Sequence, residues 1–233
     1  TYVDEFHEVS STVDGTHTIY TVDKKSGEIS LTSDITLSSK LTYAASNEEV
    51  TINGNGKTIN VTSDFGNNNN VLLNARSNLI INDLTIDMAN AAGLWGIQAL
   101  GDITLNNVNI INVDHANKYL FTLNIYGGGN AKFVDCNIAA AKNMCNENYG
   151  CVDIWFGDGR NAIIQGGNYG SIFVNSSEGS GLLHAGKLVI ESSSDHVTKI
   201  DSVTLEGEIN NKNKLVYGGT TYEKKTAYMS AIL

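Results

Sequence analysis

Apolar and polar positions alternate along this chain in a short motif that recurs many times. Each copy has an apolar residue, two mostly polar or small residues, a small or apolar residue, Thr or Asn, and an apolar residue. Five copies begin at Ile81, Leu105, Phe133, Ile164 and Ile200, and a looser copy with two extra residues begins at Ile52. Their uneven spacing predicts a fixed framework with variable loops, unlike the nearly constant periods of ankyrin or tetratricopeptide arrays.

A second row of apolar residues accompanies the first. Leu73 and Ile97 stand eight residues before a motif, and Leu123 and Ile154 stand ten before one. Ile190, ten residues before Ile200, is a candidate continuation of this row. Two motifs at paired offsets favour one strand framework that repeats in every turn of chain.

These patterns predict an all-β chain folded as a right-handed, single-stranded parallel β-helix, a solenoid of roughly seven coils. Parallel strands cannot be joined by hairpins, so the chain must wind, with coils about 4.8 Å apart. We expect a single domain over residues 1–233, with an N-terminal cap at 1–20 and a C-terminal cap at 208–233. The competing fold, an antiparallel sandwich, does not explain the paired motifs.

Composition supports many tight turns. The chain contains 29 Asn and 23 Gly and has no Pro, and Asn and Gly tolerate the left-handed backbone of tight turns. We expect Asn82 and Asn106 to stack at a tight corner, where their amides can hydrogen-bond along the ladder.

The net charge of −10 argues against nucleic acid as a partner, because phosphate binding needs clustered Lys and Arg. We expect no cofactor, although this carboxylate content would suit calcium sites. No apolar run approaches the roughly 20 residues that cross a bilayer, so we expect no membrane insertion. The chain begins at Thr1 rather than Met, which indicates a processed or trimmed chain.

Three cysteines are too few for a disulfide framework. Cys145 and Cys151 bracket a short polar stretch and could form a disulfide in an oxidising compartment. The alternative is three reduced thiols, with Cys136 as a small core residue.

The repeat resembles the pectate-lyase-like superfamily of right-handed parallel β-helix proteins over roughly residues 30–207. The resemblance implies the fold more strongly than the function, because one fold hosts many functions. The hydrolase patterns Asn-Thr-Asp, Asp-Asp and Gly-His-Gly are absent, and the lyase pattern Arg-x-Pro-x-x-Arg cannot occur without Pro. Val113-Asp114-His115 only faintly resembles a lyase element. We therefore assign no catalytic residue.

The register predicts a binding face instead. If Leu73, Ile97, Leu123 and Ile154 point inward, the next residue of each strand points outward. That row reads Asn74, Gln98, Asn124 and Trp155, with Glu191 as a candidate continuation. An indole above a row of amides is typical of a sugar-binding surface. Further candidates lie nearby in sequence: Tyr126, Asp153, Asp158 and Arg160. The alternative is that Trp155 is covered by the loop at 139–150 and serves packing.

The leading hypothesis is a non-catalytic, extracellular or cell-surface, carbohydrate-binding or adhesin-type β-helix of a bacterium, with a polysaccharide or glycan as its ligand. One alternative is a divergent polysaccharide lyase or hydrolase that acts on a uronate-rich glycan. The other is a structural or receptor-binding protein of a phage or surface layer.

Overall fold

The computed structural model describes part of the chain. The described residues are 2–4, 8–14, 17–22, 27–37, 41–43, 49–61, 71–75, 78–89, 95–99, 101–112, 123–125, 129–138, 145–146, 150–151, 154–157, 159–174, 187–201, 208–209, 215–217 and 220–222. Their secondary structure is entirely β, and none of them forms a helix that could span a membrane.

Two sheets contain most of the strands. The first sheet is formed by β1 (Tyr2–Asp4), β4 (Gly27–Leu31), β5 (Ile35–Leu37), β7 (Glu49–Val61), β9 (Asn78–Asp87), β11 (Ile103–Ile111), β13 (Gly129–Ile138), β17 (Arg160–Tyr169), β19 (Lys187–Ile190) and β20 (Thr198–Ile200). The second sheet is formed by β2 (Glu8–Asp14), β3 (His17–Val22), β6 (Leu41–Tyr43), β8 (Val71–Ala75), β10 (Trp95–Ala99), β12 (Leu123–Ile125), β16 (Ile154–Phe156) and β18 (Ile172–Val174). Smaller sheets contain β14 (Cys145–Asn146) with β15 (Gly150–Cys151), and β21 (Glu208–Ile209), β22 (Leu215–Tyr217) and β23 (Thr220–Tyr222).

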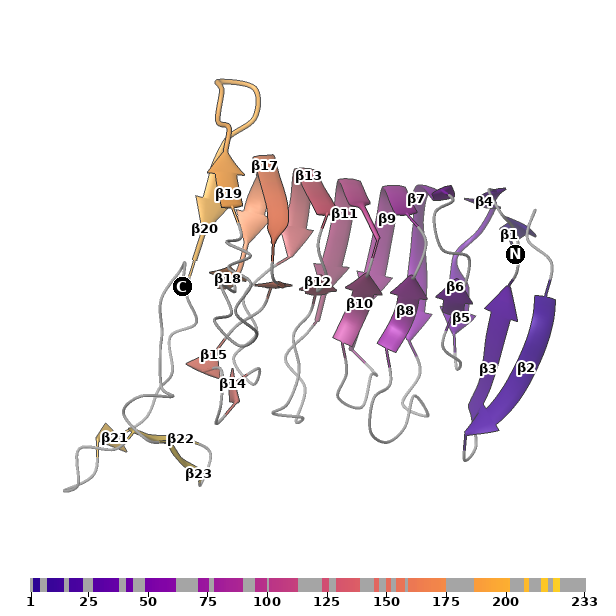
Figure 1. Cartoon of the computed structure of the whole chain (residues 1–233), viewed down its shortest axis with the longest axis horizontal. Helices are drawn as coiled ribbons and strands as arrows, with labels where there is room; N and C mark the ends of the chain where they lie inside the picture. The colour runs from indigo at the N-terminus through magenta and orange to yellow at the C-terminus, as the bar shows by residue number, and fades with distance from the viewer. Residues whose placement is uncertain are drawn as a thin grey trace.

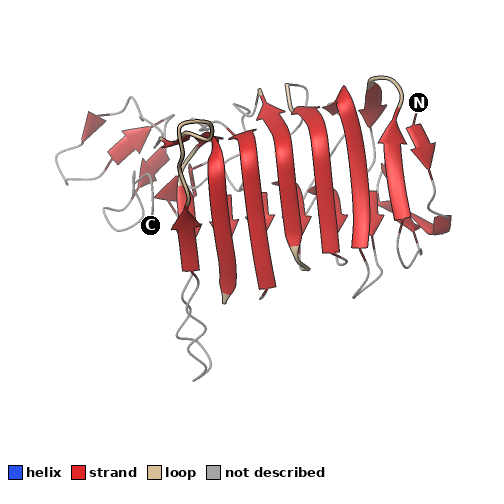
Figure 2. Ribbon diagram, turned by 90° about the horizontal axis from the view of Figure 1, so that it is seen from above, coloured by secondary structure: helices blue, strands red, loops and turns tan. Residues whose placement is uncertain are grey.

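The chain passes from one large sheet to the other and back. From β7 to β13 it enters the first sheet, the second and the first again, and each strand pairs in parallel with the equivalent strand of the previous coil. Figures 1 and 2 show the long strands of the first sheet side by side along the stack. This is a parallel β-solenoid, which confirms the predicted fold class. The described strands do not confirm the expected number of about seven coils.

The first apolar row is nearly as predicted. Ile52, Ile81, Leu105, Phe133 and Ile164 pair in that order and are all buried. β7 has two more residues than β9 across the corner, which accounts for the looser copy.

The assignment of Ile200 to this row is wrong. Ile190 pairs with Ile164, whereas Ile200 pairs with Tyr169. The physical reason is the segment 191–197, which divides the last strand of the first sheet into β19 and β20, both paired with β17.

The second row is also confirmed in its predicted part, because Leu73, Ile97, Leu123 and Ile154 are register partners. Its continuation is Ile172, which pairs with Ile154, so the candidate Ile190 is wrong. Ile97, Ile154 and Ile172 are buried in the same core as the first row.

The tight corner of each coil begins with a residue in the left-handed region, which a second positive-φ residue follows in β7 and β17. Its members, with φ near 50°, are Asn55, Asp83, Asn107 and Asp135, and Gly166 has φ of 74°. Asn and Asp adopt this conformation more readily than other non-glycine residues. Directly before it, Asn82 donates a hydrogen bond to Asn53 at 3.0 Å and accepts one from Asn106 at 2.8 Å, as the stacked-amide prediction required.

At the N-terminal end, β1 and β2 pair antiparallel with β4 and β3. The single domain and its caps at 1–20 and 208–233 stay predictions. In β14 and β15, Cys145 and Cys151 are direct antiparallel partners, a placement that suits the predicted disulfide, which also stays a prediction. Cys136 is buried with a free thiol.

Candidate functional site

The predicted binding residues fall on one row of the second sheet. Gln98 pairs with Asn74 on one side and with Asn124 on the other, and Asn124 pairs with Trp155. We call these four residues the Trp155 strip. The strip continues to Phe173, the register partner of Trp155, and the candidate Glu191 instead lies beside Gln165 on the first sheet.

Strand alternation places Trp155 on the outer side of the sheet. Trp155 lies between buried Ile154 and buried Phe156 and is itself partly exposed, because successive side chains of a strand point to opposite faces. Gln98 occupies the equivalent position between buried Ile97 and Ala99. The side chains of Asn74, Gln98 and Asn124 lie outside the described part of the structure, as do residues Tyr126, Asp153 and Asp158 and most of the loop at 139–150.

Arg160 is a buried residue, not a surface one. Its guanidinium donates hydrogen bonds to the carbonyls of Gly101 at 2.7 Å, Ala99 at 3.3 Å and Asn130 at 3.4 Å. Burial lowers its pKa to about 10, and the negative charge of Asp102 opposes that shift. Arg160 thus connects the backbones of neighbouring coils, and this placement takes it off the surface that a glycan could contact.

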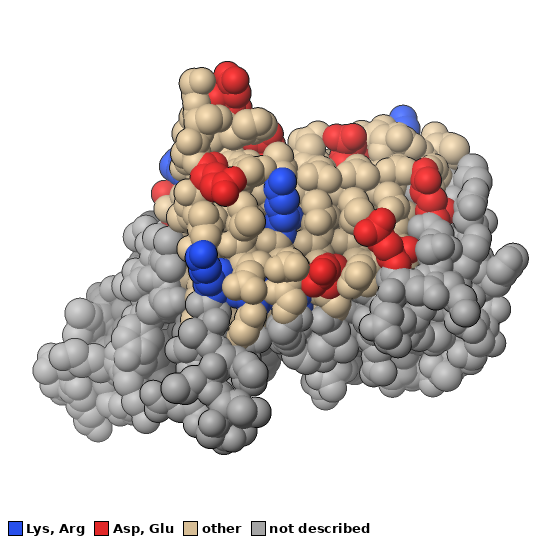
Figure 3. All heavy atoms as spheres, turned by 45° about the horizontal axis from the view of Figure 1, so that its top comes forward, with Lys and Arg blue, Asp and Glu red and all other residues tan. Residues whose placement is uncertain are grey.

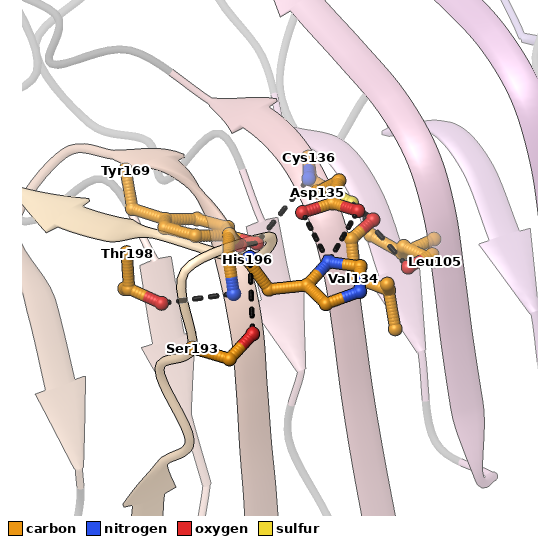
Figure 4. A network of polar contacts seen from close by, with 9 residues as sticks. Leu105, Val134, Asp135, Cys136, Tyr169, Ser193, His196 and Thr198 are labelled. Atoms are coloured by element: carbon orange, nitrogen blue, oxygen red, sulfur yellow. Dashed lines mark hydrogen bonds and ion pairs between the residues drawn. The ribbon is translucent and has the colours of Figure 1, made fainter.

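A polar site that the sequence did not indicate lies at the corner of the last described coils (Figure 4). Nδ1 of His196 lies 2.8 and 3.0 Å from the two carboxylate oxygens of Asp135. Because a carboxylate only accepts, Nδ1 is the donor. Both side chains are about 45% exposed, and solvent makes such a pair weak.

Gly166 leaves the space in which Asp135 and His196 meet, because it has no side chain. It occupies the corner position between Asp135 and the 191–197 loop, and a Cβ there would collide with an Asp135 carboxylate oxygen and crowd His196. Its own amide donates to the Thr198 hydroxyl at 2.9 Å. His196 therefore reaches past one coil to the next, a long-range contact that no local sequence pattern could reveal.

Buried polar groups lie beneath the pair. The Tyr169 hydroxyl donates to the Gly166 carbonyl at 2.8 Å and accepts the Cys136 amide at 3.4 Å. Burial raises the pKa of Tyr169 well above its usual range and that of Cys136 to about 11. Both groups are therefore uncharged at neutral pH.

The chemical capacity of this corner is limited. An Asp-oriented imidazole can act as a base through Nε2, but no described contact brings a nucleophile to that atom. No cluster of three or more His, Cys, Asp or Glu side chains suited to a metal ion occurs within the described segments. Calcium remains an untested expectation.

Comparison with known proteins bears on this surface. Residues 21–122 match a family described as "putative pectate lyase-like adhesive domain". The pectate-lyase-like resemblance is confirmed. The matched segment is slightly less than half of the chain and includes Asn74 and Gln98 but not Trp155. It supports an adhesive role in general. No curated protein and no solved structure matches the chain.

Proposed function

We propose that this protein is a non-catalytic, carbohydrate-binding adhesive solenoid displayed on a bacterial cell surface. The observation that carries the proposal is the Trp155 strip, one register row over four coils that includes a partly exposed indole. Strands about 4.8 Å apart repeat binding positions at a distance comparable to the length of one sugar unit. The indole offers a face for a pyranose ring, and the amides of the row are suited to hydroxyl groups.

The adhesive family match supports the same proposal. The buried position of Arg160 adds to it, because the arginine nearest to this row in sequence serves the fold and is unavailable as a surface base. A partner-binding surface without catalytic groups is what adhesion requires.

A glycan array with wild type and Trp155→Ala tests the proposal. We expect the variant to lose about fivefold or more in apparent affinity for the best glycans, because stacking on a Trp contributes about 1 kcal/mol, as in other aromatic contacts. Ile163→Ala is the matched control, since it removes a partly exposed apolar side chain from the first sheet. Absence of glycan binding by wild type, or equal binding by wild type and Trp155→Ala, would refute the proposal.

A further inference from the structure

A second polar row on the first sheet differs from the stacked amides of the corner. It lies two or three positions after the corner and contains one uncharged residue from each of five strands: Thr58, Thr85, Asn109, Asn137 and Asn168. We call it the amide row. In β9, β11 and β13 the row lies between two core residues, as Val108 and Ile110 show beside Asn109, so the row faces away from the core.

The two sets of amides use their hydrogen-bonding groups differently. Asn53, Asn82 and Asn106 bond to one another along the stack, which makes that ladder part of the fold. Among the described residues, the side chains of Asn109, Asn137 and Asn168 make no hydrogen bond, and the hydroxyls of Thr58 and Thr85 make none either. The described part of the protein therefore does not use the donors and acceptors of the amide row.

Carboxylates outnumber cations around the row, where Lys57 and Lys199 are the described cations. Four carboxylates flank it, and each accepts a described hydrogen bond: Asp34 from the Thr58 amide, Asp83 from Asn107, Asp87 from Asn112, and Asp135 from His196. Lys199, the register partner of Asn168, pairs with Asp201 at 3.2 Å. Figure 3 shows charged side chains scattered over a described surface that is otherwise uncharged.

We propose that the amide row binds an extended, uncharged, β-linked polysaccharide that runs along the solenoid axis. Five equivalent positions, each about 4.8 Å from the next, offer one amide or hydroxyl to each successive sugar. The flanking carboxylates disfavour an anionic chain such as a polyuronate, because like charges repel. The proposal rests on the carbohydrate-binding function proposed above but uses a different sheet from the Trp155 strip.

The experiment measures depletion of protein from solution by insoluble cellulose and chitin, with calcium-free polygalacturonate gel as the charged probe. We expect wild type to bind a neutral polymer in preference to the gel. Asn109→Ala with Asn137→Ala removes two adjacent amides and should weaken binding about tenfold, as the loss of two hydrogen bonds implies.

Asn130→Ala with Asn161→Ala is the matched control, because these exposed residues are also adjacent partners on the first sheet, and it should bind within about twofold of wild type. Thr85→Val, which keeps shape and strand preference, should cost about fivefold through its hydroxyl. Circular dichroism of each variant verifies that it is folded.

The outcomes separate the two surfaces. Equal binding by the amide-row variant and its control, or binding of wild type only to polygalacturonate, overturns the inference. Loss of binding in Trp155→Ala with retention in the amide-row variant leaves the proposed function standing and overturns the inference. The reverse result supports the amide row and refutes the Trp155 strip, and a wild type that binds no glycan refutes both.

Discussion

At the scale of single residues, identical side chains have different roles that depend on their position in the coil. Asn82 is bonded on both sides within the stack, whereas Asn109, one strand away and two positions past its corner, makes no side-chain hydrogen bond in the described structure. Arg160 is a charged residue of a type that is mostly exposed, yet it is buried. The surrounding coils determine these roles, so residue type alone does not identify them.

The buried thiol of Cys136 should make the protein less stable as the pH rises above 9. Its pKa rises from 9.0 to about 11 on folding, so the folded state holds a proton that the unfolded state releases between these values. That contribution is complete below pH 9 and is lost as pH rises through 11. We expect unfolding free energy to fall by about 2 to 3 kcal/mol over this window. Urea titrations from pH 8 to 11.5 measure it, and Cys136→Ala should show a smaller decline; parallel curves would contradict the assignment.

At the scale of elements, the long strands of the first sheet bend at a left-handed corner, and β9 and β11 have an amide side chain directly before it. Asp83 and Asn107 occupy this corner, and Asn107 donates to Asp83 at 2.9 Å. The ladder and the corner thus reinforce each other from coil to coil. Where Val134 replaces the amide, in register with Asn106, the ladder of stacked amides ends.

The stacked amides should contribute measurably to stability. Asn82→Ala removes one hydrogen bond to Asn53 and one from Asn106 and should lower the unfolding free energy by about 2 kcal/mol. Asn109→Ala is the matched control with the same change of residue, and we expect an effect within about 0.5 kcal/mol. Urea denaturation compares the two, and an equal loss in both variants would show that the ladder is not a stabilising network.

At the scale of the whole molecule, each coil depends on its neighbours. β11 pairs with β9 on one side and β13 on the other, whereas β19 and β20 each pair only with β17 among the described strands. Val197, in the loop that separates β19 from β20, is 69% exposed, and Ile190 is 42% exposed. A solenoid with such an end has its least stable elements there.

The rate of amide hydrogen exchange should reflect this difference in stability between the middle of the stack and its C-terminal end. Amides of β9, β11 and β13 should exchange about a hundredfold more slowly than those of β19 and β20, because strands with two partners open only with larger parts of the stack. Mass spectrometry of peptic peptides measures the rates. Protection of β19 and β20 equal to that of β11 would mean that this end is held by further contacts.

The alternation and recurrence of apolar residues were sufficient to predict the solenoid, two of its internal rows and the register of the Trp155 strip, because stacking demands the same pattern in every coil. The prediction from sequence assigned Ile190 and Ile200 to the wrong rows, because the inserted loop shifts the strand register and no local sequence pattern reveals the shift. The tertiary structure alone decided that Arg160 is buried, that His196 reaches Asp135 across Gly166, and which amides are already bonded. The physical reason is that every coil buries the same positions, so its apolar residues recur at short, regular spacings in the sequence. Contacts between coils depend instead on the lengths of the loops that join the strands.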